Sequence, residues 1–454
     1  MNLNQHIFRA NDIRGVAYED LSEEVVIQLG KALGSEAQDR NINEFIIGRD
    51  GRLSSPDIFE WLSSGILSTG CNVIDIGIVT SPMFYHSTYT LGTSSGVVIT
   101  GSHNPGEYNG FKIVFNNNST SSEEILMLKQ RILYDDLRTG RGLLREELIE
   151  ESYIEKIVNS VSLKKKLSIS IDCGNGAAGV IAKKVYERLG CSVIELFGEV
   201  DGSFPNHHPD PSKIENMKDL MENVENNRSH VGLAFDGDAD RLGVISPDGE
   251  MIYPDRQMIL FARQVIQSTP KAKIVYDVKC SKLLSDEILV AGGKPLICKT
   301  GHTFIKQKIR ETNAQLGGEM SGHIFFNDRW PGFDDGIYAG ARLLEIIAGS
   351  SKKNVFTDIP NMISTPEINI PAADDEKFEI VEKFIEESEF DGANVIDIDG
   401  IRVEFKEGWG LLRASNTSPV LVLRFEADTE DDLAGIKNIF YQNLKNITPN
   451  LKGF

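Results

Sequence analysis

Short apolar runs and amphipathic stretches alternate along the chain, and one arrangement of them occurs three times before residue 300. An apolar run that ends in Asp leads into a helical stretch, which is followed by Gly and a second apolar run. The interval is long enough for a crossover helix, so each copy predicts a βαβ unit with parallel strands. The paired runs are residues 45–50 and 70–77, 167–172 and 190–197, and 273–277 and 292–297.

A second shared feature follows each unit: a strand, a polar loop that contains Gly, and another strand. We expect the corresponding loops of three repeated domains to converge on one cleft, although solvent-facing hairpins would give the same pattern. The flanking strands are expected at residues 96–100 and 111–115, 231–235 and 242–246, and 315–317 and 324–326.

From about residue 363 the pattern becomes that of an antiparallel α+β domain. Strands are expected at 367–370 and 420–427, a hairpin at 395–405, and helices at 376–387 and from Thr429 to Leu444. We therefore divide the chain into four domains, with boundaries interpolated between elements: residues 1–148, 149–250, 251–362 and 363–454.

Composition narrows the possible functions. The chain has 454 residues, with 47 Lys and Arg against 67 Asp and Glu, which gives a formal net charge of −20. Such an acidic chain disfavours nucleic acids and anionic membranes as partners, because both attract clustered Lys and Arg. Without an apolar leader or a stretch of ~18 apolar residues, we expect a soluble cytoplasmic protein. The five widely spaced cysteines are expected to be reduced core thiols.

The first chemically distinctive loop spans residues 100–112 and contains Ser102, His103, Asn104 and Lys112. A hydroxyl, an imidazole, an amide and an ammonium group thus follow one strand in a Gly-rich loop. Ser102 is a candidate nucleophile or phosphate carrier, whereas an ordinary Asn-Pro-Gly turn explains residues 104–106 without function.

The second loop places Asp236, Asp238 and Asp240 directly after an apolar strand and before Arg241. In extended backbone, alternate residues share one side, so three carboxylates can meet at a hard ion such as Mg²⁺. An EF-hand is excluded, because its sixth and twelfth positions are Arg241 and Pro247 here. The alternative is a solvated acidic turn.

Two later loops complete the candidate chemistry. Residues 317–323 contain Glu319, Ser321 and His323 among glycines, groups that recognise polyols, although a Gly-rich hairpin is the alternative. Residues 413–419 combine Arg413 with hydroxyls and an amide, which suits a phosphate dianion, while a capped turn is the alternative.

Two further motifs mislead when taken alone. Residues 174–179 satisfy G-x-G-x-x-G after a strand, which is typical of dinucleotide-binding oxidoreductases. The other two βαβ units lack these glycines, so we interpret the glycines as residues that allow close packing of helix against strand. Residues 92–96 match the G-x-S-x-G elbow of hydrolases, but they precede a strand instead of joining a strand to a helix.

The four loops in this order resemble those of the α-D-phosphohexomutase family, and most closely those of its bacterial phosphomannomutase/phosphoglucomutase members. The resemblance implies three related α/β domains with mixed sheets and a C-terminal α+β domain around a central cleft. It also implies that Ser102 is phosphorylated and that the three aspartates bind one Mg²⁺ per chain, with the serine phosphate completing the coordination.

The resemblance carries further residues over. Glu319 and Ser321 match sugar contacts, and the distal phosphate site matches Arg413, Ser415, Asn416 and Thr417. Substrate-contacting or cleft positions match Arg14, Lys279 and His302, although Asn11 stands where the subgroup usually has Tyr. Met320 is typical of the mannose/glucose subgroup, since phosphoglucosamine mutases usually have Gln there.

The implied reaction moves a phosphoryl group between Ser102 and a hexose 1- or 6-phosphate through a 1,6-bisphosphate, which would also serve as activator. Mg²⁺, Arg241 and Lys112 would offset charge on the transferring group. His103, Lys112 and His302 are all candidates for the general acid or base. A monomer is expected. Phosphoglucosamine mutase, a noncatalytic phosphosugar sensor and a dinucleotide-dependent oxidoreductase remain alternatives.

Overall fold

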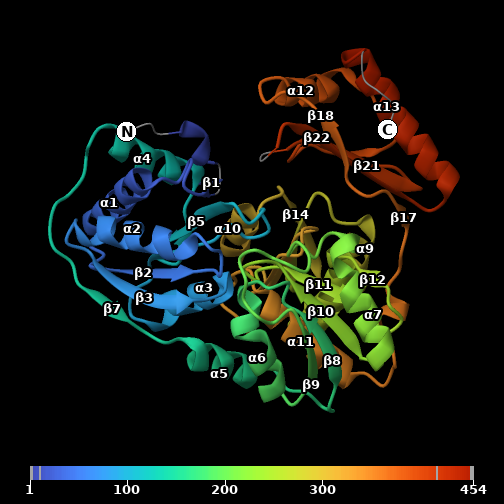
Figure 1. Ribbon diagram of the computed structural model, residues 1–454. Coiled ribbons are helices and arrows are strands. Elements are labelled where there is room, and N and C mark those ends of the chain that lie inside the picture. The colour runs from blue at the N-terminus through green and yellow to red at the C-terminus, as the bar shows by residue number, and fades with distance from the viewer. Residues whose placement is uncertain (1–3, 10–11, 416–417, 450–454) are drawn as a thin grey trace. The chain divides into compact units, whose positions relative to one another are not determined.

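The computed structural model describes residues 4–9, 12–415 and 418–449, coloured along the chain in Figure 1. These residues form two compact units, which we describe separately. The first comprises the residues up to Pro254 together with Ser321–Thr357. The second comprises Asp255–Met320 together with the residues from Asp358 onward.

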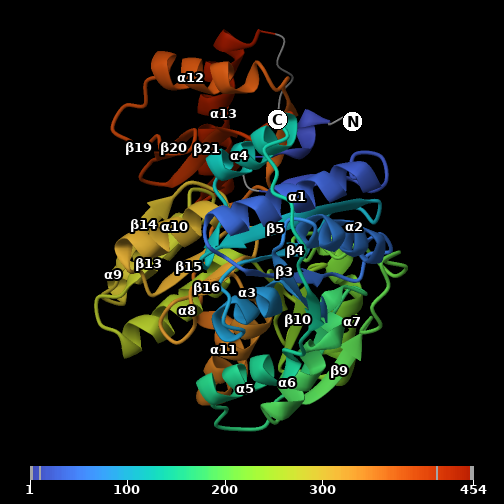
Figure 2. The same cartoon turned by 90° about the vertical axis from the view of Figure 1, so that its left-hand side faces the viewer.

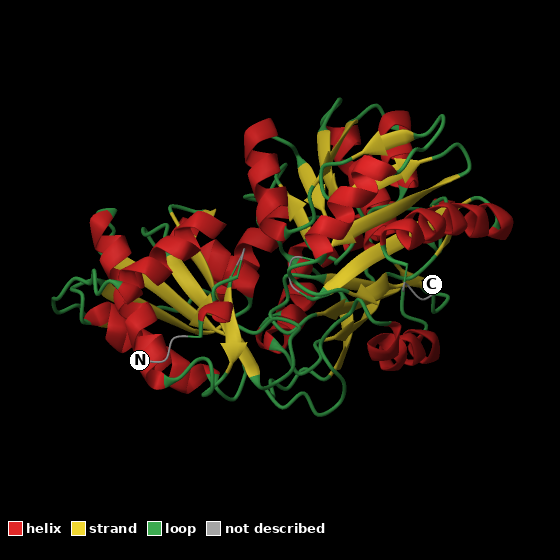
Figure 3. Ribbon diagram, turned by 90° about the horizontal axis from the view of Figure 1, so that it is seen from above, coloured by secondary structure: helices red, strands yellow, loops and turns green. Residues whose placement is uncertain are grey.

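The first sheet is mixed, with the strand order β1-β5-β4-β2-β3-β7 and β6 paired to β5. β2 runs parallel to β3 and β4, whereas β5 runs antiparallel to β4 and β1. Figure 3 shows these strands side by side with helices along them. The strands are β1 (Ile13–Val16), β2 (Glu44–Arg49), β3 (Asn72–Ile78), β4 (Gly96–Ile99), β5 (Tyr108–Phe115), β6 (Asn118–Ser119) and β7 (Leu144–Glu146).

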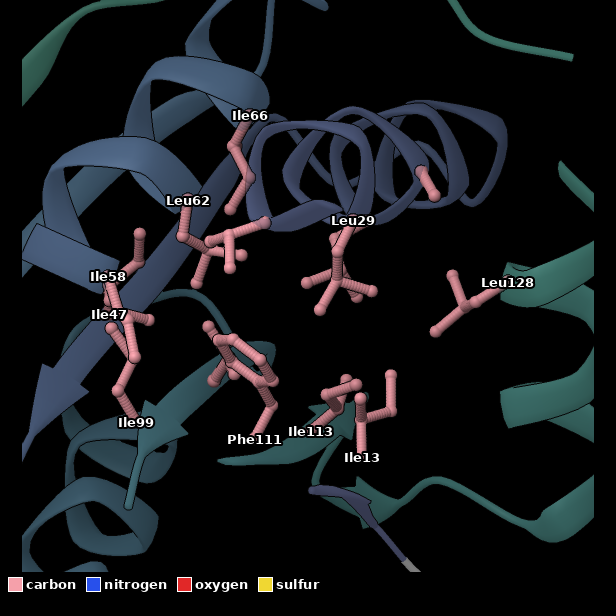
Figure 4. Packing of buried hydrophobic residues seen from close by; sticks show 14 of the residues in the cluster. Ile13, Leu29, Ile47, Ile58, Leu62, Ile66, Ile99, Phe111, Ile113 and Leu128 are labelled. Atoms are coloured by element: carbon pink, nitrogen blue, oxygen red, sulfur yellow. The ribbon is translucent and has the colours of Figure 1, made fainter. Parts of the chain in front are cut away.

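Helices cover this sheet because their apolar positions recur at helical spacing and face its strands. In Figure 4, Leu29, Leu62 and Leu128 point from three helices towards Phe111 on β5. Two of these helices cross closely: a Cβ on Gly30 would lie 2.3 Å from the carbonyl oxygen of Leu62. The helices are α1 (Glu23–Asp39), α2 (Ser55–Leu67), α3 (Ser81–Thr90) and α4 (Ser122–Leu133), after the 3-10 helix Gln5–Ile7.

The second sheet of the first unit is also mixed, in the order β12-β11-β10-β8-β9. β8 runs parallel to β9 and β10, and β10 pairs antiparallel with β11. The strands are β8 (Ser168–Asp172), β9 (Ser192–Leu196), β10 (Val231–Phe235), β11 (Leu242–Ile245) and β12 (Met251–Ile252). The helices are α5 (Glu150–Ser160), α6 (Ala182–Arg188) and α7 (Lys218–Asn227), with 3-10 turns at Ala177–Val180 and Ile214–Met217.

A later segment of the chain belongs to the same unit. Strand β16 (Ile324–Phe326) leads to helix α11 (Gly336–Gly349), which contacts β10 and β11. The 3-10 helix Val355–Asp358 follows α11. This segment therefore brings residues from beyond position 320 to the sheet that carries the acidic loop.

The second unit contains a parallel set of strands and an antiparallel sheet. β13 (Lys273–Asp277) runs parallel to β14 (Lys294–Cys298) and β15 (Leu316–Gly318). The helices of this part are α8 (Pro254–Ser268), α9 (Lys282–Val290) and α10 (His302–Thr312). All three sequence-predicted βαβ units are therefore confirmed, since β2, β8 and β13 each run parallel to the strand that follows their crossover helix.

The C-terminal sheet pairs antiparallel throughout, as predicted. Helices α12 (Lys377–Glu387) and α13 (Glu430–Ile447) pack against β21 and lie beside the sheet in Figure 2. The strands are β17 (Ile363–Ser364), β18 (Ile368–Pro371), β19 (Asn394–Ile396), β20 (Ile401–Glu404), β21 (Gly408–Ala414) and β22 (Val420–Ala427). The predicted fold class, with mixed α/β sheets followed by an α+β domain, is confirmed.

The G-x-G-x-x-G segment has a structural role. Instead of opening an α-helix, it enters a 3-10 turn, and the N–H of Ala177 donates to the carbonyl of Gly237 at 2.9 Å. A Cβ on Gly179 would lie 2.0 Å from the carbonyl oxygen of Gly198. The glycines do permit close packing, as predicted, but against neighbouring loops and not between a helix and a strand. Since its N–H groups are used internally, this turn does not present the anion site of a dinucleotide-binding loop.

The remaining global expectations concern cysteines and membranes. All five cysteines lie among the described residues, and each is buried and free of a disulfide, as predicted. Across the described part of the chain, we find no helix with the length and apolar character of a membrane span.

His86 on α3 is a buried ionisable group that affects stability. Its Nε2 lies 3.0 Å from the hydroxyl of Ser152, and its ring packs edge-on against Tyr153. Burial, assisted by the positive charge of Lys156, lowers the pKa of His86 to about 4. Between pH ~6.5 and about 4, His86 is therefore protonated in the unfolded chain but neutral in the folded protein.

We predict that His86→Gln reduces the acid sensitivity of folding. As the pH falls from 7 to 4, protonation of unfolded His86 costs the wild type about 3 kcal/mol of unfolding free energy, which Gln does not lose. The melting temperatures of wild type and variant should therefore converge at low pH. His6→Gln, at an exposed position, is the control and should show no convergence. A constant difference between wild type and His86→Gln would disprove the prediction.

Candidate functional site

Ser102 lies in the loop between β4 and β5, and its side chain is enclosed. Only 2% of the residue is exposed, and its φ of +49° lies in the left-handed region that non-glycine residues rarely adopt. The hydroxyl of Thr100 accepts the N–H of Ser102 at 2.8 Å. The Ser102 hydroxyl lies 3.1 Å from Nδ1 of His103 and donates to Oδ2 of Asp236 at 3.0 Å.

Asp236, Asp238 and Asp240 lie between β10 and β11, and all three are fully buried. We expected extended backbone here, and that expectation is wrong. The chain turns, with the N–H of Ala239 donating to the carbonyl of Asp236 at 3.0 Å and Ala239 at φ +60°. The turn nevertheless brings one oxygen of each carboxylate within 4.8 Å of the others. Proximity therefore comes from the tight turn and not from the two-residue repeat of a strand.

Basic side chains surround these carboxylates. The ammonium of Lys112, on β5, lies 2.5 Å from Oδ2 of Asp238 and 2.5 Å from Oδ2 of Asp240. Nε2 of His323 lies 3.2 Å from Oδ1 of Asp240, and Nε of Arg241 lies 3.7 Å from Oδ2 of Asp236. Residues from three separated parts of the sequence thus contact one acidic turn.

The surroundings shift the pKa values of Asp236 and Asp240 in opposite directions. Burial raises the pKa of Asp236 well above its usual value, and the nearby charges of Asp240 and Asp238 add to that effect. Burial alone would raise the pKa of Asp240 too, but Lys112 and His323 outweigh it and hold that pKa well below normal. The charges of Asp238 and Asp240 outweigh burial at Lys112 and raise its pKa, so its ammonium stays charged.

The donor set fits a hard divalent cation. Oδ1 of Asp238 is buried and, among the described residues, accepts no hydrogen bond. An orphaned buried carboxylate oxygen is costly unless it faces a cation. Because three carboxylates supply only oxygen donors, the set matches the preference of Mg²⁺. A second possible set, Asp240, His323 and Asp334, shares one aspartate with the first and mixes nitrogen with oxygen.

Two other predicted residues contact the Ser102 loop or His323. Arg14, on β1, forms a hydrogen bond with the amide oxygen of Asn104 in the Ser102 loop and an ion pair with Asp12 at 2.5 Å. Ser321 contacts His323, with its hydroxyl 2.9 Å from Nδ1. Asn11, whose identity departs from the subgroup, lies outside the described residues.

His103 is held in its neutral form. Burial, together with the positive charges of Arg241 and Arg14, lowers its pKa well below the usual value. A neutral imidazole beside the Ser102 hydroxyl can accept a proton from it or return one to it.

The remaining predicted residues lie in the second unit. The ammonium of Lys279, which follows β13, lies 2.7 Å from Oε1 of Glu367. Glu319 accepts the N–H of Gly301 at 2.7 Å, one residue before His302 begins α10. The described contacts thus form two groups, one in each unit.

Asp277, at the end of β13, contacts the loop that contains Glu319 within the second unit. Its Oδ1 accepts the N–H of Met320 at 3.4 Å, and its Oδ2 lies 3.5 Å from the hydroxyl of Thr300. Burial raises the pKa of Asp277 to about 6, although Lys279 opposes the shift.

Arg413 lies on β21 with only 5% of the residue exposed, and its Nε donates to Asp399 at 3.1 Å. Ser415 follows it and is also buried. Asn416 and Thr417, the other predicted members of this phosphate site, lie outside the described residues.

Sequence reasoning missed residues that act through tertiary contacts. Ser81, at the start of α3, donates its hydroxyl to Oδ2 of Asp238 at 2.5 Å. Nε2 of His208 donates to the carbonyl of His103 at 2.5 Å. Arg52 donates to the carbonyls of Ser102 and Asn104 in the Ser102 loop. Their sequence contexts, a helix start, a His pair and a turn after a strand, carry no sign of these partners.

A buried serine hydroxyl beside an acidic turn that fits a cation defines a site suited to metal-assisted phosphoryl transfer. Family models for phosphoglucomutase/phosphomannomutase match almost the whole chain. The alpha/beta/alpha domains I, II and III match residues 5–135, 151–249 and 253–360, and the C-terminal domain matches residues 367–442. The chain belongs to the phosphoglucomutase/phosphomannomutase family.

Individual relatives agree with this assignment. The chain is 49% identical over 447 residues to the phosphomannomutase/phosphoglucomutase of Pseudomonas aeruginosa, covering 98% of this chain and 96% of that protein. It is 46% identical over 444 residues to the phosphoglucomutase of Neisseria gonorrhoeae, covering 97% and 96%. The crystal structure of a phosphoglucomutase/phosphomannomutase family protein from Burkholderia thailandensis matches with a TM-score of 0.95 at 43% identity, covering all of both chains.

We predict that Asp238→Asn weakens cation binding. The substitution removes the charge from the carboxylate whose Oδ1 accepts no hydrogen bond in the described structure. The dissociation constant for Mg²⁺, measured by calorimetry, or for Mn²⁺, measured by electron paramagnetic resonance, should rise at least ~10-fold.

Asp248→Asn is the control for this experiment, because Asp248 is exposed and lies outside the acidic turn. It should bind the ion as the wild type does. Equal affinity in Asp238→Asn and the control would show that the ion binds elsewhere.

Proposed function

We propose that this chain catalyses the reversible transfer of a phosphoryl group between the 6- and 1-positions of mannose and glucose phosphates. The observation that carries the proposal is the enclosed Ser102 hydroxyl, 3.0 Å from Oδ2 of Asp236 in the acidic turn. The names of the relatives, phosphomannomutase/phosphoglucomutase and phosphoglucomutase, support the same activity.

The proposed reaction begins with phosphoserine at position 102. A hydroxyl oxygen of the hexose phosphate forms a bond to phosphorus while the bond between phosphorus and the Ser102 oxygen breaks. The sugar hydroxyl gives up its proton, and the departing serine oxygen takes one up. The resulting 1,6-bisphosphate then returns its other phosphoryl group to Ser102, so atoms and charge balance over the cycle.

The candidate site residues of the first unit each have a proposed role. Asp236, Asp238 and Asp240 would hold Mg²⁺, which when bound offsets negative charge on the transferring group. Lys112 and Arg241 add positive charge from the protein. Because phosphoryl transfer depends mainly on positioning and charge compensation, these groups are the expected source of rate.

Proton transfer is proposed for His103. Its neutral ring lies 3.1 Å from the Ser102 hydroxyl, within reach of the proton that this oxygen gains or loses. Lys112 is less suited to act as a base, because its ammonium is paired with two carboxylates. His302 remains the candidate contributed by the second unit.

Substrate binding is proposed for residues of both units. The contacts to the sugar would come from Glu319, Ser321, His323 and Lys279, and Arg14 would approach the phosphate beside Ser102. The distal phosphate would bind Arg413, Ser415, Asn416 and Thr417. In the proposed division of labour, residues 1–148 carry the phosphoserine, 149–250 the metal, 251–362 the sugar contacts and 363–454 the distal phosphate.

The wider setting is also part of the proposal. We expect one Mg²⁺ per chain, hexose 1,6-bisphosphate as activator, a monomer and a cytoplasmic location. Hexose phosphates are the only partners that the proposal requires.

We predict that Ser102→Ala reduces mutase turnover at least ~10³-fold, because the phosphoryl carrier is lost. After incubation with glucose 1,6-bisphosphate, the intact mass of the wild type should increase by one phosphate, mapped to Ser102, and the variant should gain none. Binding of glucose 1-phosphate should persist in the variant. Ser94→Ala, in the preceding loop, is the control. Near-normal turnover of Ser102→Ala would refute the phosphoserine role.

We also predict a substrate preference that separates the alternatives. The wild type should show kcat/KM at least ~10-fold higher for mannose and glucose 1-phosphates than for glucosamine 1-phosphate, a ratio within reach of pocket contacts. A preference for glucosamine 1-phosphate would favour phosphoglucosamine mutase. Saturable NAD binding would instead favour the oxidoreductase, and sugar-phosphate binding without turnover would favour the sensor.

A further inference from the structure

A buried arginine holds the backbone of the Ser102 loop. Arg52 follows β2, and only 2% of it is exposed. Its Nη2 donates to the carbonyls of Ser102 and Asn104, both at 2.7 Å. Its Nη1 donates to the carbonyls of Pro105 at 2.6 Å and Tyr108 at 2.9 Å. One side chain therefore binds three carbonyls of the loop and the first carbonyl of β5.

The fifth donor of this guanidinium fixes its orientation. Nε donates to Oδ2 of Asp50 at 3.1 Å, so all five N–H groups of Arg52 have acceptors. Asp50 also accepts the N–H of Gly101 at 3.2 Å and the hydroxyl of Ser55 at 2.7 Å. The Asp50 carboxylate thus binds both the guanidinium and the backbone of the loop that the guanidinium contacts.

Space around this contact leaves little freedom. A Cβ on Gly101 would lie 2.4 Å from Cζ of Arg52, so the loop backbone rests directly on the guanidinium. Lysine cannot reproduce the arrangement, because its three donors leave a single nitrogen. The contact therefore depends on the planar fork of arginine and not only on its charge.

The loop needs such support because Ser102 adopts an unfavourable conformation. A left-handed φ at a non-glycine residue is strained and persists only where its surroundings impose it. Arg52 binds the carbonyl on the C-terminal side of that residue, while Thr100 binds its N–H. These two contacts fix both peptide groups that flank the Ser102 side chain.

We propose that Arg52 is a positioning residue for phosphoryl transfer. By holding the carbonyls of the loop, it keeps the Ser102 oxygen aimed at the acidic turn, and it has no N–H left for a phosphate or sugar. The proposal rests on the proposed role of Ser102 as phosphoryl carrier. It adds that the rate of transfer depends on a side chain that substrate does not touch.

The test is Arg52→Lys, which keeps the charge but loses the fork. We expect kcat for glucose 1-phosphate to fall ~10- to 100-fold, the range for a small misplacement of a reacting group. KM should stay within about 3-fold of the wild type, since the groups that bind substrate are unchanged. The rate at which the protein gains one phosphate from glucose 1,6-bisphosphate should fall by the same factor as kcat.

Arg49→Lys is the matched control. Arg49 ends β2, three residues before Arg52, and pairs with Asp75 at 2.8 Å, but it makes none of the loop contacts. It should retain wild-type kcat and the wild-type rate of phosphate gain. Melting temperatures of all variants report whether a loss of rate accompanies a loss of folding.

The outcomes decide between distinct conclusions. If Arg52→Lys matches the control in kcat, or if kcat, KM and melting temperature all deteriorate together, the positioning role is overturned. If the wild type gains no phosphate from the bisphosphate, the proposed function fails instead. If Arg52→Lys does not fold, Asp50→Asn decides: a lower kcat at unchanged KM supports the proposal, and a wild-type kcat overturns it.

Discussion

Three carboxylates buried within 4.8 Å of one another impose the strongest constraint on the first unit. Like charges at that separation cannot all persist without positive charge nearby. The protein supplies it from β5 and from the residue after the turn, through Lys112 and Arg241. His323, from the segment beyond position 320, also contacts the turn, with Nε2 3.2 Å from Oδ1 of Asp240. Compensation therefore explains why two mixed sheets and a later segment of the chain meet at one turn. It also leaves carboxylate oxygen available for a divalent cation.

A different kind of contact supports the turns that carry the candidate site residues Ser102 and Lys279. In the first unit, Arg52 holds carbonyls of the Ser102 loop. In the second unit, Arg402 donates to the carbonyls of Val278 and Cys280, and Arg424 donates to that of Lys279. Buried guanidinium groups suit this task, because several fixed donors satisfy several backbone acceptors at once. The turn at Val278–Cys280 and the Ser102 loop are thus both held through their backbones.

Much of the fold follows from local patterns. Apolar runs ending in Asp, followed by a helical interval and Gly, correctly located β2, β8 and β13 and their parallel partners. This was possible because the length of a crossover connection and the two strands that it joins lie within one short segment of the chain. The acidic loop shows where such reasoning fails. Its three aspartates do meet, but in a turn with Ala239 at positive φ, and no period of hydrophobic residues specifies that geometry. The packing role of the G-x-G-x-x-G glycines was likewise predictable, whereas the loops they pack against were not.

The amino-acid sequence by itself determined the α/β repeats, the antiparallel tail and the identities of the chemical groups, because propensity, periodicity and motif are local properties. Only the tertiary structure decided which groups touch. Ser81 reaches Asp238 from 157 positions away, and Arg52 reaches Ser102 from 50 positions away. Such contacts arise when separate elements pack around shared buried charge. Their energy depends on distance and dielectric surroundings, neither of which exists until the chain has folded.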